Sequence, residues 1–199
     1  MVLQASMKAA IPCVVAVVLL CSSMAEAAQQ PVHRTTGTHS QRVSSAADTE
    51  AQLNLTRHYL QTGRTSAALQ LASKISAAHA DDAAVHFTLG MLLASAKKYR
   101  AAQHEFELAQ ALQPDSFDAL LNLGQIYLRN REYPKAELVL NRALKLRSDS
   151  PDALGSLAQV YSNQMRPLDA IDLLLRAYKL APQNTDVILH LARASMSQK

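Results

Sequence analysis

The chain has 199 residues with a formal net charge of +4, and 49% of its residues are hydrophobic, enough for one domain of ordinary size with a buried core. Gly and Pro are scarce and Trp is absent, while Ala and Leu are abundant, which favours helix over sheet. The Lys and Arg residues are spread along the sequence. We therefore expect no nucleic-acid partner, because nucleic-acid sites carry basic stripes or patches.

Residues 1–27 have the features of a secretory signal peptide. Lys8 precedes 17 uncharged residues, and the segment ends in the small-residue pattern of residues 25–27. We expect export, cleavage after Ala27, and a periplasmic or extracellular location in a bacterium. The alternative is an uncleaved membrane anchor, for which 17 residues is the short limit. Lipidation at Cys21 is disfavoured because the large Leu20 precedes it, where that motif has a small residue.

Cleavage would remove both cysteines, Cys13 and Cys21, and leave no disulfide, thiol nucleophile or thiolate metal site. Residues 28–48 that follow are dominated by Thr, Ser and Gln, and they offer little apolar surface to offset the entropy of ordering. The sequence therefore predicts a disordered tether over residues 28–48.

The rest of the chain is built on a period of 34 residues, the mark of a stacked-repeat protein. Four uninterrupted blocks follow one another, over residues 49–82, 83–116, 117–150 and 151–184. A half block, residues 185–199, is either a capping helix or a truncated fifth repeat. The seventh residue of every block is leucine: Leu55, Leu89, Leu123, Leu157 and Leu191.

Each block is expected to hold two helices. The residue before every block is a preferred N-cap, so a first helix should start at each boundary and end near the thirteenth or fourteenth residue. A second helix follows, with Ala at the twentieth residue of all four blocks, and Pro114 and Pro182 mark where two of these helices end. The five predicted caps are Asp48, Asp82, Ser116, Ser150 and Asn184.

These positions resemble the tetratricopeptide repeat. In residues 83–116 the matches are Leu89-Gly90, Ala102, Phe106, Ala109 and Pro114, and the next two blocks match as well. Block 49–82 matches less well, and the family's Trp at position 4 is missing throughout. The resemblance implies an all-α fold: a right-handed α-solenoid of four helix-turn-helix repeats plus a C-terminal capping helix, with a concave groove lined by the first helices.

The resemblance also indicates which residues face that groove. Phe87 and Met91 lie one turn apart and suit an adaptable apolar contact, so we expect them to anchor a segment of a protein partner. The alternative is that the apolar residues here pack between helices as core. The family's clamp for a terminal carboxylate needs Lys at position 5 and Asn at position 9, and neither is present. The candidate groove residues are Arg57, Phe87, Met91, Gln125, Arg129, Gln159 and Asn163.

No motif indicates an enzyme. The seven His residues form no metal-binding pattern, and there is no P-loop, nucleophile elbow or Gly-rich phosphate loop. We expect no catalytic residue, no cofactor and no bound metal. The sequence predicts an exported scaffold that binds a protein or peptide, such as an envelope assembly or adaptor factor. Two alternatives stay open: a module that self-associates end to end, and a non-catalytic subunit of an enzyme complex.

Overall fold

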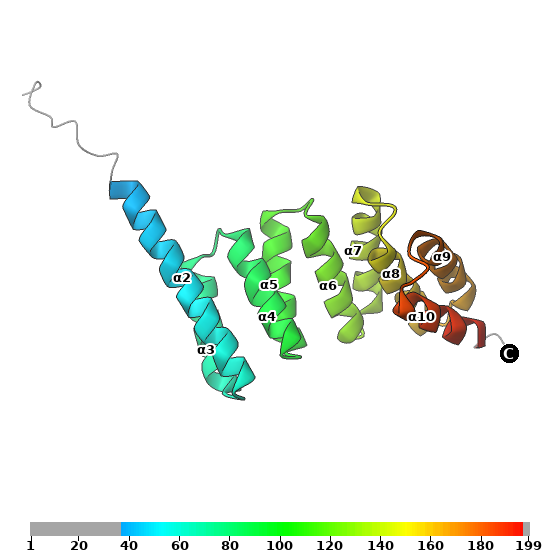
Figure 1. The fold of residues 1–199 in the computed structure, drawn as a ribbon, viewed down its shortest axis with the longest axis horizontal. Coiled ribbons are helices and arrows are strands. Elements are labelled where there is room, and N and C mark those ends of the chain that lie inside the picture. The colour runs from blue at the N-terminus through cyan, green and yellow to red at the C-terminus, as the bar shows by residue number, and fades with distance from the viewer. Residues whose placement is uncertain (1–36, 197–199) are drawn as a thin grey trace, which may run out of the picture. The chain divides into compact units, whose positions relative to one another are not determined.

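The computed structural model describes the backbone of residues 37–196 and the side chains of residues 46–196 (Figure 1). Within these residues the chain forms nine helices and no strand. The first helices of the repeats are α2 (Gly37–Gln61), α4 (Ala83–Ser95), α6 (Phe117–Arg129), α8 (Pro151–Asn163) and α10 (Thr185–Met196). The second helices are α3 (Thr65–Ala78), α5 (Tyr99–Leu112), α7 (Tyr133–Leu146) and α9 (Pro167–Leu180).

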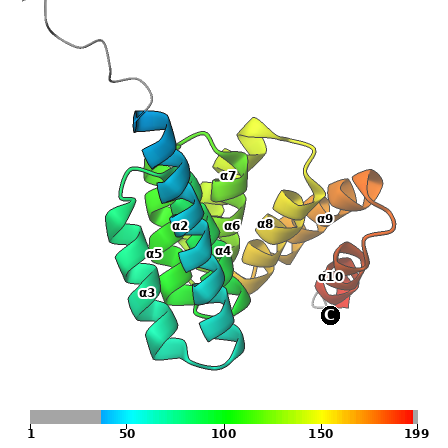
Figure 2. The same cartoon turned by 60° about the vertical axis from the view of Figure 1, so that its left-hand side comes forward.

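From α3 onward the helices stack in chain order as antiparallel hairpins, so the fold is an α-solenoid (Figures 1 and 2). The first helices α4, α6 and α8 each have 13 residues, and the second helices α3, α5, α7 and α9 each have 14. Helices α4, α6 and α8 begin at residues 83, 117 and 151, which are the predicted block boundaries.

Four of the five predicted caps are confirmed. The backbone N–H groups of Ala84 and Val85 donate to Asp82 Oδ1 at 2.9 and 3.2 Å. Ser116 and Ser150 each accept one such bond at 3.3 Å, and Asn184 accepts two at 3.1 and 3.3 Å. These bonds satisfy donors that a helix N-terminus leaves free, which fixes where each repeat begins.

The prediction for Asp48 was wrong. Helix α2 begins at Gly37, so Asp48 lies inside a helix and residues 37–48 of the predicted tether are helical. No Gly or Pro interrupts residues 38–61, and extending a helix costs far less than nucleating a new one. A polar composition therefore did not prevent helix formation here. The predicted signal peptide and residues 28–36 of the tether lie outside the described residues.

The core follows the repeat columns. Ala68, Ala102, Ala136 and Ala170 are fully buried, and so are the larger Phe106, Leu140 and Leu174 one turn further along. The first helices α4 and α6 approach the second helices of their own repeats closely, over small residues. A Cβ atom on Gly124 would lie 2.5 Å from Leu140 Cγ, and one on Gly90 would lie 2.8 Å from the Phe106 ring. Glycine at these two positions lets the helix axes approach at native packing density.

The leucine at the seventh position is not buried in the first repeat. Leu89, Leu123 and Leu157 are at most 2% exposed, whereas Leu55 is 42% exposed. Leu89 packs against α3 of the preceding repeat, and among the described residues no helix pair precedes α2 to cover Leu55 in the same way. The seventh position is therefore buried by the neighbour before it, a contact that a periodic sequence does not reveal at the first repeat.

Polar side chains also join successive repeats. Asn130 donates to Gln103 at 2.6 Å, and Gln164 donates to Glu137 at 3.1 Å, at the same repeat positions one block later. Arg142 donates to the carbonyl of Pro114 at 3.1 Å, tying the end of one repeat to the next. No helix of the described residues is long and apolar enough to cross a membrane.

Candidate functional site

The first helices α6, α8 and α10 together line a hollow of about 430 Å³. Three of the predicted groove residues, Gln125, Arg129 and Gln159, lie in its wall. Gly155 contributes a position where an added Cβ would meet no atom within 4 Å, so the helix surface is open there. The repeat period therefore gathers residues 34 apart in the sequence around one cavity.

The wall of this hollow is held together by side-chain bonds between neighbouring repeats. Gln125 Nε2 donates to Ser156 Oγ at 3.4 Å, and Gln159 Nε2 lies 3.4 Å from His190 Nε2. The second bond needs a neutral imidazole that accepts the amide proton. Burial first, and then the nearby positive charge of Arg193, lower the pKa of His190, with Asp186 opposing them. The neutral form is thereby favoured.

Charges of both signs line the same hollow. Arg129 and Arg193 lie in its wall together with Asp152 and Asp186, and no ion pair within 4.0 Å involves any of these four in the described part of the chain. Unpaired guanidinium groups and carboxylates beside amide side chains offer both donors and acceptors. Such a surface suits the backbone and polar side chains of a bound polypeptide.

Phe87 lies in a different and smaller hollow. This cavity of about 190 Å³ is lined by Phe87 and by alanines of α4, α5 and α6, together with Gln113, Ser116 and Asp118. The Phe87 ring packs edge-on against Phe106, with centroids 5.7 Å apart. Phe87 is half-buried and Met91 is 44% exposed. Phe87 thus belongs partly to the core, as the alternative interpretation held, and still borders open space.

Besides Met91, the predicted groove residues Arg57 and Asn163 lie outside both hollows. Arg57 is exposed on α2 and donates to Asn54 Oδ1 at 2.5 Å. Asn163 is exposed at the end of α8 and donates to the carbonyl of Gln159 at 2.7 Å. Both side chains are engaged with their own helix. The structure therefore divides the predicted set, with only Gln125, Arg129 and Gln159 sharing one cavity.

Several residues of the hollow were missed from the sequence, among them Ser156 and His190. Ser156 and His190 bond to the two glutamines, and both occupy the sixth position of their blocks. A signal for them exists, because the sixth position is polar in every block, with Asn54, Thr88 and Asn122 in the others. Because the first helix of every repeat has a polar residue at this position, these residues form a polar row along the stacked first helices.

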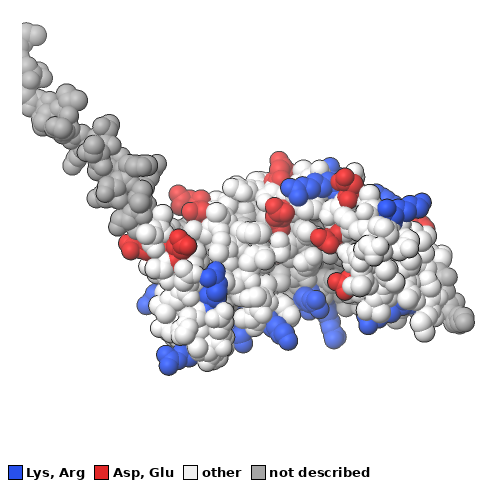
Figure 3. All heavy atoms as spheres, viewed as in Figure 1, with Lys and Arg blue, Asp and Glu red and all other residues white. Residues whose placement is uncertain are grey.

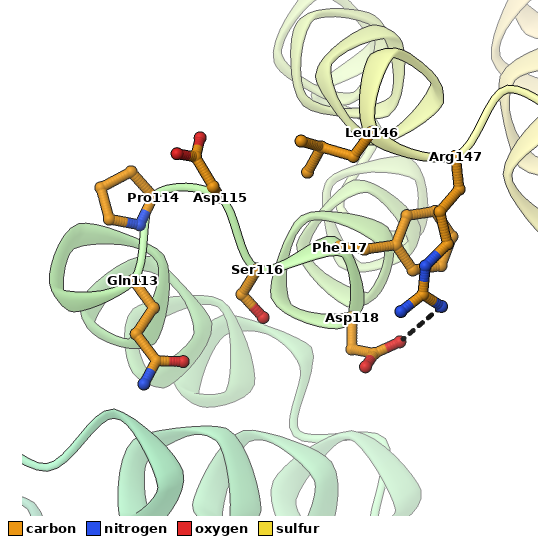
Figure 4. A pocket seen from close by; sticks show the side chains of 8 residues that line it. All are labelled: Gln113, Pro114, Asp115, Ser116, Phe117, Asp118, Leu146 and Arg147. Carbon is orange, nitrogen blue, oxygen red and sulfur yellow. Dashed lines mark ion pairs between the residues drawn. The ribbon is translucent and has the colours of Figure 1, made fainter.

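A further hollow of about 550 Å³ lies where the loop between α5 and α6 meets the end of α7 (Figure 4). Its one cation, Arg147, stacks 4.2 Å above the centre of the Phe117 ring and lies 3.9 Å from Asp118. Asp115 points away from this pair (Figure 4). Across the described residues, no group of three or more His, Cys, Asp and Glu side chains is placed to hold a metal ion.

Comparison with known proteins agrees with this architecture. A tetratricopeptide repeat family model matches residues 87–151 and residues 127–185. MamA from Desulfovibrio magneticus RS-1 superposes with a TM-score of 0.64 at 21% identity, over 75% of this chain and 85% of that chain. No curated protein sequence matches the chain.

Two isolated repeat domains of known structure are also similar. The first is the first tetratricopeptide domain of Spaghetti (RPAP3) bound to the HSP90 peptide SRMEEVD, with a TM-score of 0.56 at 20% identity over 58% of this chain and 92% of that chain. The second is the Arabidopsis OM64 tetratricopeptide domain, with a TM-score of 0.55 at 18% identity over 56% and 93%. At these identities the superpositions establish the fold alone.

Proposed function

Because the chain belongs to the tetratricopeptide repeat family, whose members serve as protein-interaction scaffolds, we propose that it holds a segment of a partner protein against its first helices. The main contact would be the hollow between α6, α8 and α10. The protein itself performs no catalysis. The observation that carries the proposal is the pair of bonds from Gln125 and Gln159 to the next repeat, which hold a polar, open cavity in a fixed shape.

A fixed cavity favours binding because little conformational entropy is lost when the partner arrives. The wall side chains are already oriented by their neighbours, and the guanidinium groups of Arg129 and Arg193 remain free to bond to carbonyl or carboxylate oxygens. An extended segment can satisfy these donors and the acceptors of Asp152 and Asp186 with its own backbone.

An apolar side chain of the same segment would lie near Phe87 and Met91. Met91 exposes 44% of its surface, and its flexible thioether can adapt to different partners. The alanine-lined hollow beside Phe87 is large enough for a small aliphatic side chain. The polar hollow would thus orient the segment, and the apolar contact would add affinity.

The similar RPAP3 domain was solved with a peptide bound, which supports a peptide as the kind of ligand. The way of binding must differ from a clamp for a terminal carboxylate, because position 5 holds Leu53, Phe87, Leu121, Gly155 and Leu189 in this chain and no Lys. We therefore propose that an internal segment of the partner is bound.

The proposed place of action is the bacterial envelope, as an assembly or adaptor factor. This part rests on residues 1–27, whose basic start, apolar run and small-residue end are typical of an exported chain. The intact mass of the exported protein tests it. A mass equal to that of residues 28–199 supports cleavage after Ala27, and the mass of the full chain supports retention as an anchor.

Site-specific photo-crosslinking tests the proposed surface. A photoreactive residue replaces Gln125 or Met91 in the groove, and Leu138 in the control, a 64% exposed side chain on the second helix α7. In bacterial cells that export the protein, we expect the same partner to be crosslinked from both groove positions and not from position 138. Equal linking from all three positions would reject the groove as the binding surface.

A further inference from the structure

The repeat gives the solenoid two long edges with opposite charge. The turn edge is formed by the turns inside the repeats, residues 61–66, 95–100, 129–134 and 163–168. The loop edge is formed by the loops between repeats, residues 79–84, 113–118, 147–152 and 181–186. Because first helices run from the loop edge to the turn edge, the two edges lie at opposite ends of the helices (Figure 1).

The turn edge holds seven cations and one carboxylate, Glu132, and the cations are Arg64, Lys97, Lys98, Arg100, Arg129, Arg131 and Arg166. The segments of the loop edge hold seven carboxylates and one cation, Arg147, and the carboxylates are Asp81, Asp82, Asp115, Asp118, Asp149, Asp152 and Asp186. Arg142 and Arg176 also reach this edge, where they donate to the carbonyls of Pro114 and Ser148. Figure 3 shows a row of Lys and Arg along the lower side and most visible carboxylates above them, with further Lys or Arg groups among those carboxylates on the upper side. Positive charge that looks dispersed in the sequence is thus gathered by the 34-residue period.

Helix dipoles explain only part of this pattern. Asp82 caps α4, and acids near the starts of α6, α8 and α10 suit the positive ends of those helices. Asp81, Asp115 and Asp149 lie before the caps, at the same position of three successive repeats. All three are exposed, and none forms an ion pair within the described residues. They form an unused row of carboxylates.

The cations of the turn edge are placed against local preference. Lys98 is the N-cap of α5 and Arg100 lies in its first turn, where positive charge opposes the helix dipole. Lys97 and Arg131 have φ angles of 59° and 63°, in the left-handed region that favours glycine; at the same position the first repeat has Gly63 and the fourth has the uncharged Met165, with φ of 59°.

None of these four cations forms an ion pair within the described residues. Their placement costs stability, and no ion pair within the described residues offsets that cost. An anionic ligand outside the molecule would account for it.

We propose that the turn edge of one molecule binds the loop edge of a second copy. The two rows have opposite charge, and both recur once per repeat of the same stack, so their spacing along the solenoid is matched. With repeats in register, Asp115 of one copy meets Lys97 and Lys98 of the other, and Asp149 meets Arg131. The residues paired here line neither of the two hollows proposed to bind the partner, although the edges also include Arg129, Asp152 and Asp186 of the first hollow.

The geometry fixes the kind of assembly. The two surfaces differ and lie at opposite ends of the helices, so the contact is head-to-tail and a bound pair still presents one free edge of each sign. A contact of this kind grows into open rows instead of closing as a dimer. The attraction between the two copies comes from exposed charges. Salt must therefore weaken the contact, since the screening length falls from about 30 Å at 0.01 M to about 3 Å at 1 M.

Sedimentation velocity tests the proposal. The protein is purified as cells produce it, with or without residues 1–27. The sedimentation coefficient should rise with protein concentration at 0.01 M salt and return to the monomer value at 1 M salt. A turn-edge variant (Lys97→Gln, Lys98→Gln and Arg131→Gln) and a loop-edge variant (Asp81→Asn, Asp115→Asn and Asp149→Asn) should each stay monomeric at 0.01 M salt.

Mixing the two variants gives the decisive result. Each retains the edge that the other has lost, so the mixture should form one-to-one dimers that grow no further, which also shows that both variants are folded. A control variant carries Lys74→Gln on the second helix α3, outside both edges, and should assemble like the wild type.

Three results would overturn the proposal. The first is a wild-type protein that stays monomeric at 0.01 M salt. The second is a variant mixture that stays monomeric or grows without limit, which would place the contact elsewhere, for example end to end. The third is a turn edge that binds anionic phosphatidylglycerol vesicles or duplex DNA while copies of the chain do not bind one another.

Discussion

Replacing Gly124 with alanine probes the close approach of α6 and α7 directly. A Cβ atom there would lie 2.5 Å from Leu140 Cγ and 2.6 Å from Cδ2, which is closer than real Cβ contacts come. Leu140 is fully buried and cannot swing away. The chain also provides a matched control in Gly155, a helical glycine of α8 where an added Cβ meets no atom within 4 Å.

The pair of variants separates two effects. Both substitutions gain about 1 kcal/mol of helix propensity, because alanine replaces glycine inside a helix. Only Gly124→Ala also overpacks the core, which costs about 1–3 kcal/mol. We therefore expect Gly155→Ala to raise the free energy of unfolding by about 0.5–1 kcal/mol. Gly124→Ala should lie about 1–3 kcal/mol below Gly155→Ala, since the propensity gain cancels in the comparison.

Urea denaturation followed by circular dichroism at 222 nm measures both free energies of unfolding, and thermal melts check them, with about 2–4 °C expected per kcal/mol for a domain of this size. If Gly124→Ala were as stable as Gly155→Ala, α6 and α7 could not approach as closely as the structure shows, and the role given to Gly124 would be refuted.

Three other predictions concern stability. Leu123→Ala should cost about 2–5 kcal/mol, and Leu55→Ala under about 1 kcal/mol, because the first side chain is buried and the second is 42% exposed; equal losses in urea denaturation would contradict this. Gly63→Ala should destabilise by about 1 kcal/mol because φ is +75°, while Arg131→Gly, at φ 63°, should lower the melting temperature less than Gly63→Ala or raise it. The pKa of His190 is lowered in the folded state, so the unfolded chain gains the proton first as pH falls. The free energy of unfolding should therefore decrease as pH drops below about 6.5. Denaturation curves at pH 7.5 and pH 5 measure this decrease, which His190→Gln should reduce.

The repeat architecture could be predicted from sequence because each block states the same local rules again. Caps, buried alanines and helix ends recur at one spacing, so errors in one block are corrected by the others. Prediction failed where the repetition begins. Asp48 looks like a cap and Leu55 like core only by analogy with later blocks, but no helix pair precedes α2 among the described residues, and nothing in residues 38–61 stops the helix.

The site was less predictable for a physical reason. The family resemblance placed Gln125, Arg129 and Gln159 on the groove, and these three do share one hollow. Which side chains are engaged depends on neighbours one repeat away, such as Ser156 beside Gln125. The charged edges were missed for the same reason, because like charges lie 34 residues apart in the sequence and side by side in the stack.

The most direct test of the account is the affinity of the crosslinked partner segment for groove variants. Isothermal titration calorimetry would compare the wild type with Gln125→Ala plus Gln159→Ala, with Phe87→Ala plus Met91→Ala, and with the control Leu138→Ala. We predict that each double variant weakens binding at least about tenfold, or about 1.4 kcal/mol, and that Leu138→Ala binds like the wild type. Unchanged affinity in both double variants would contradict the proposed groove.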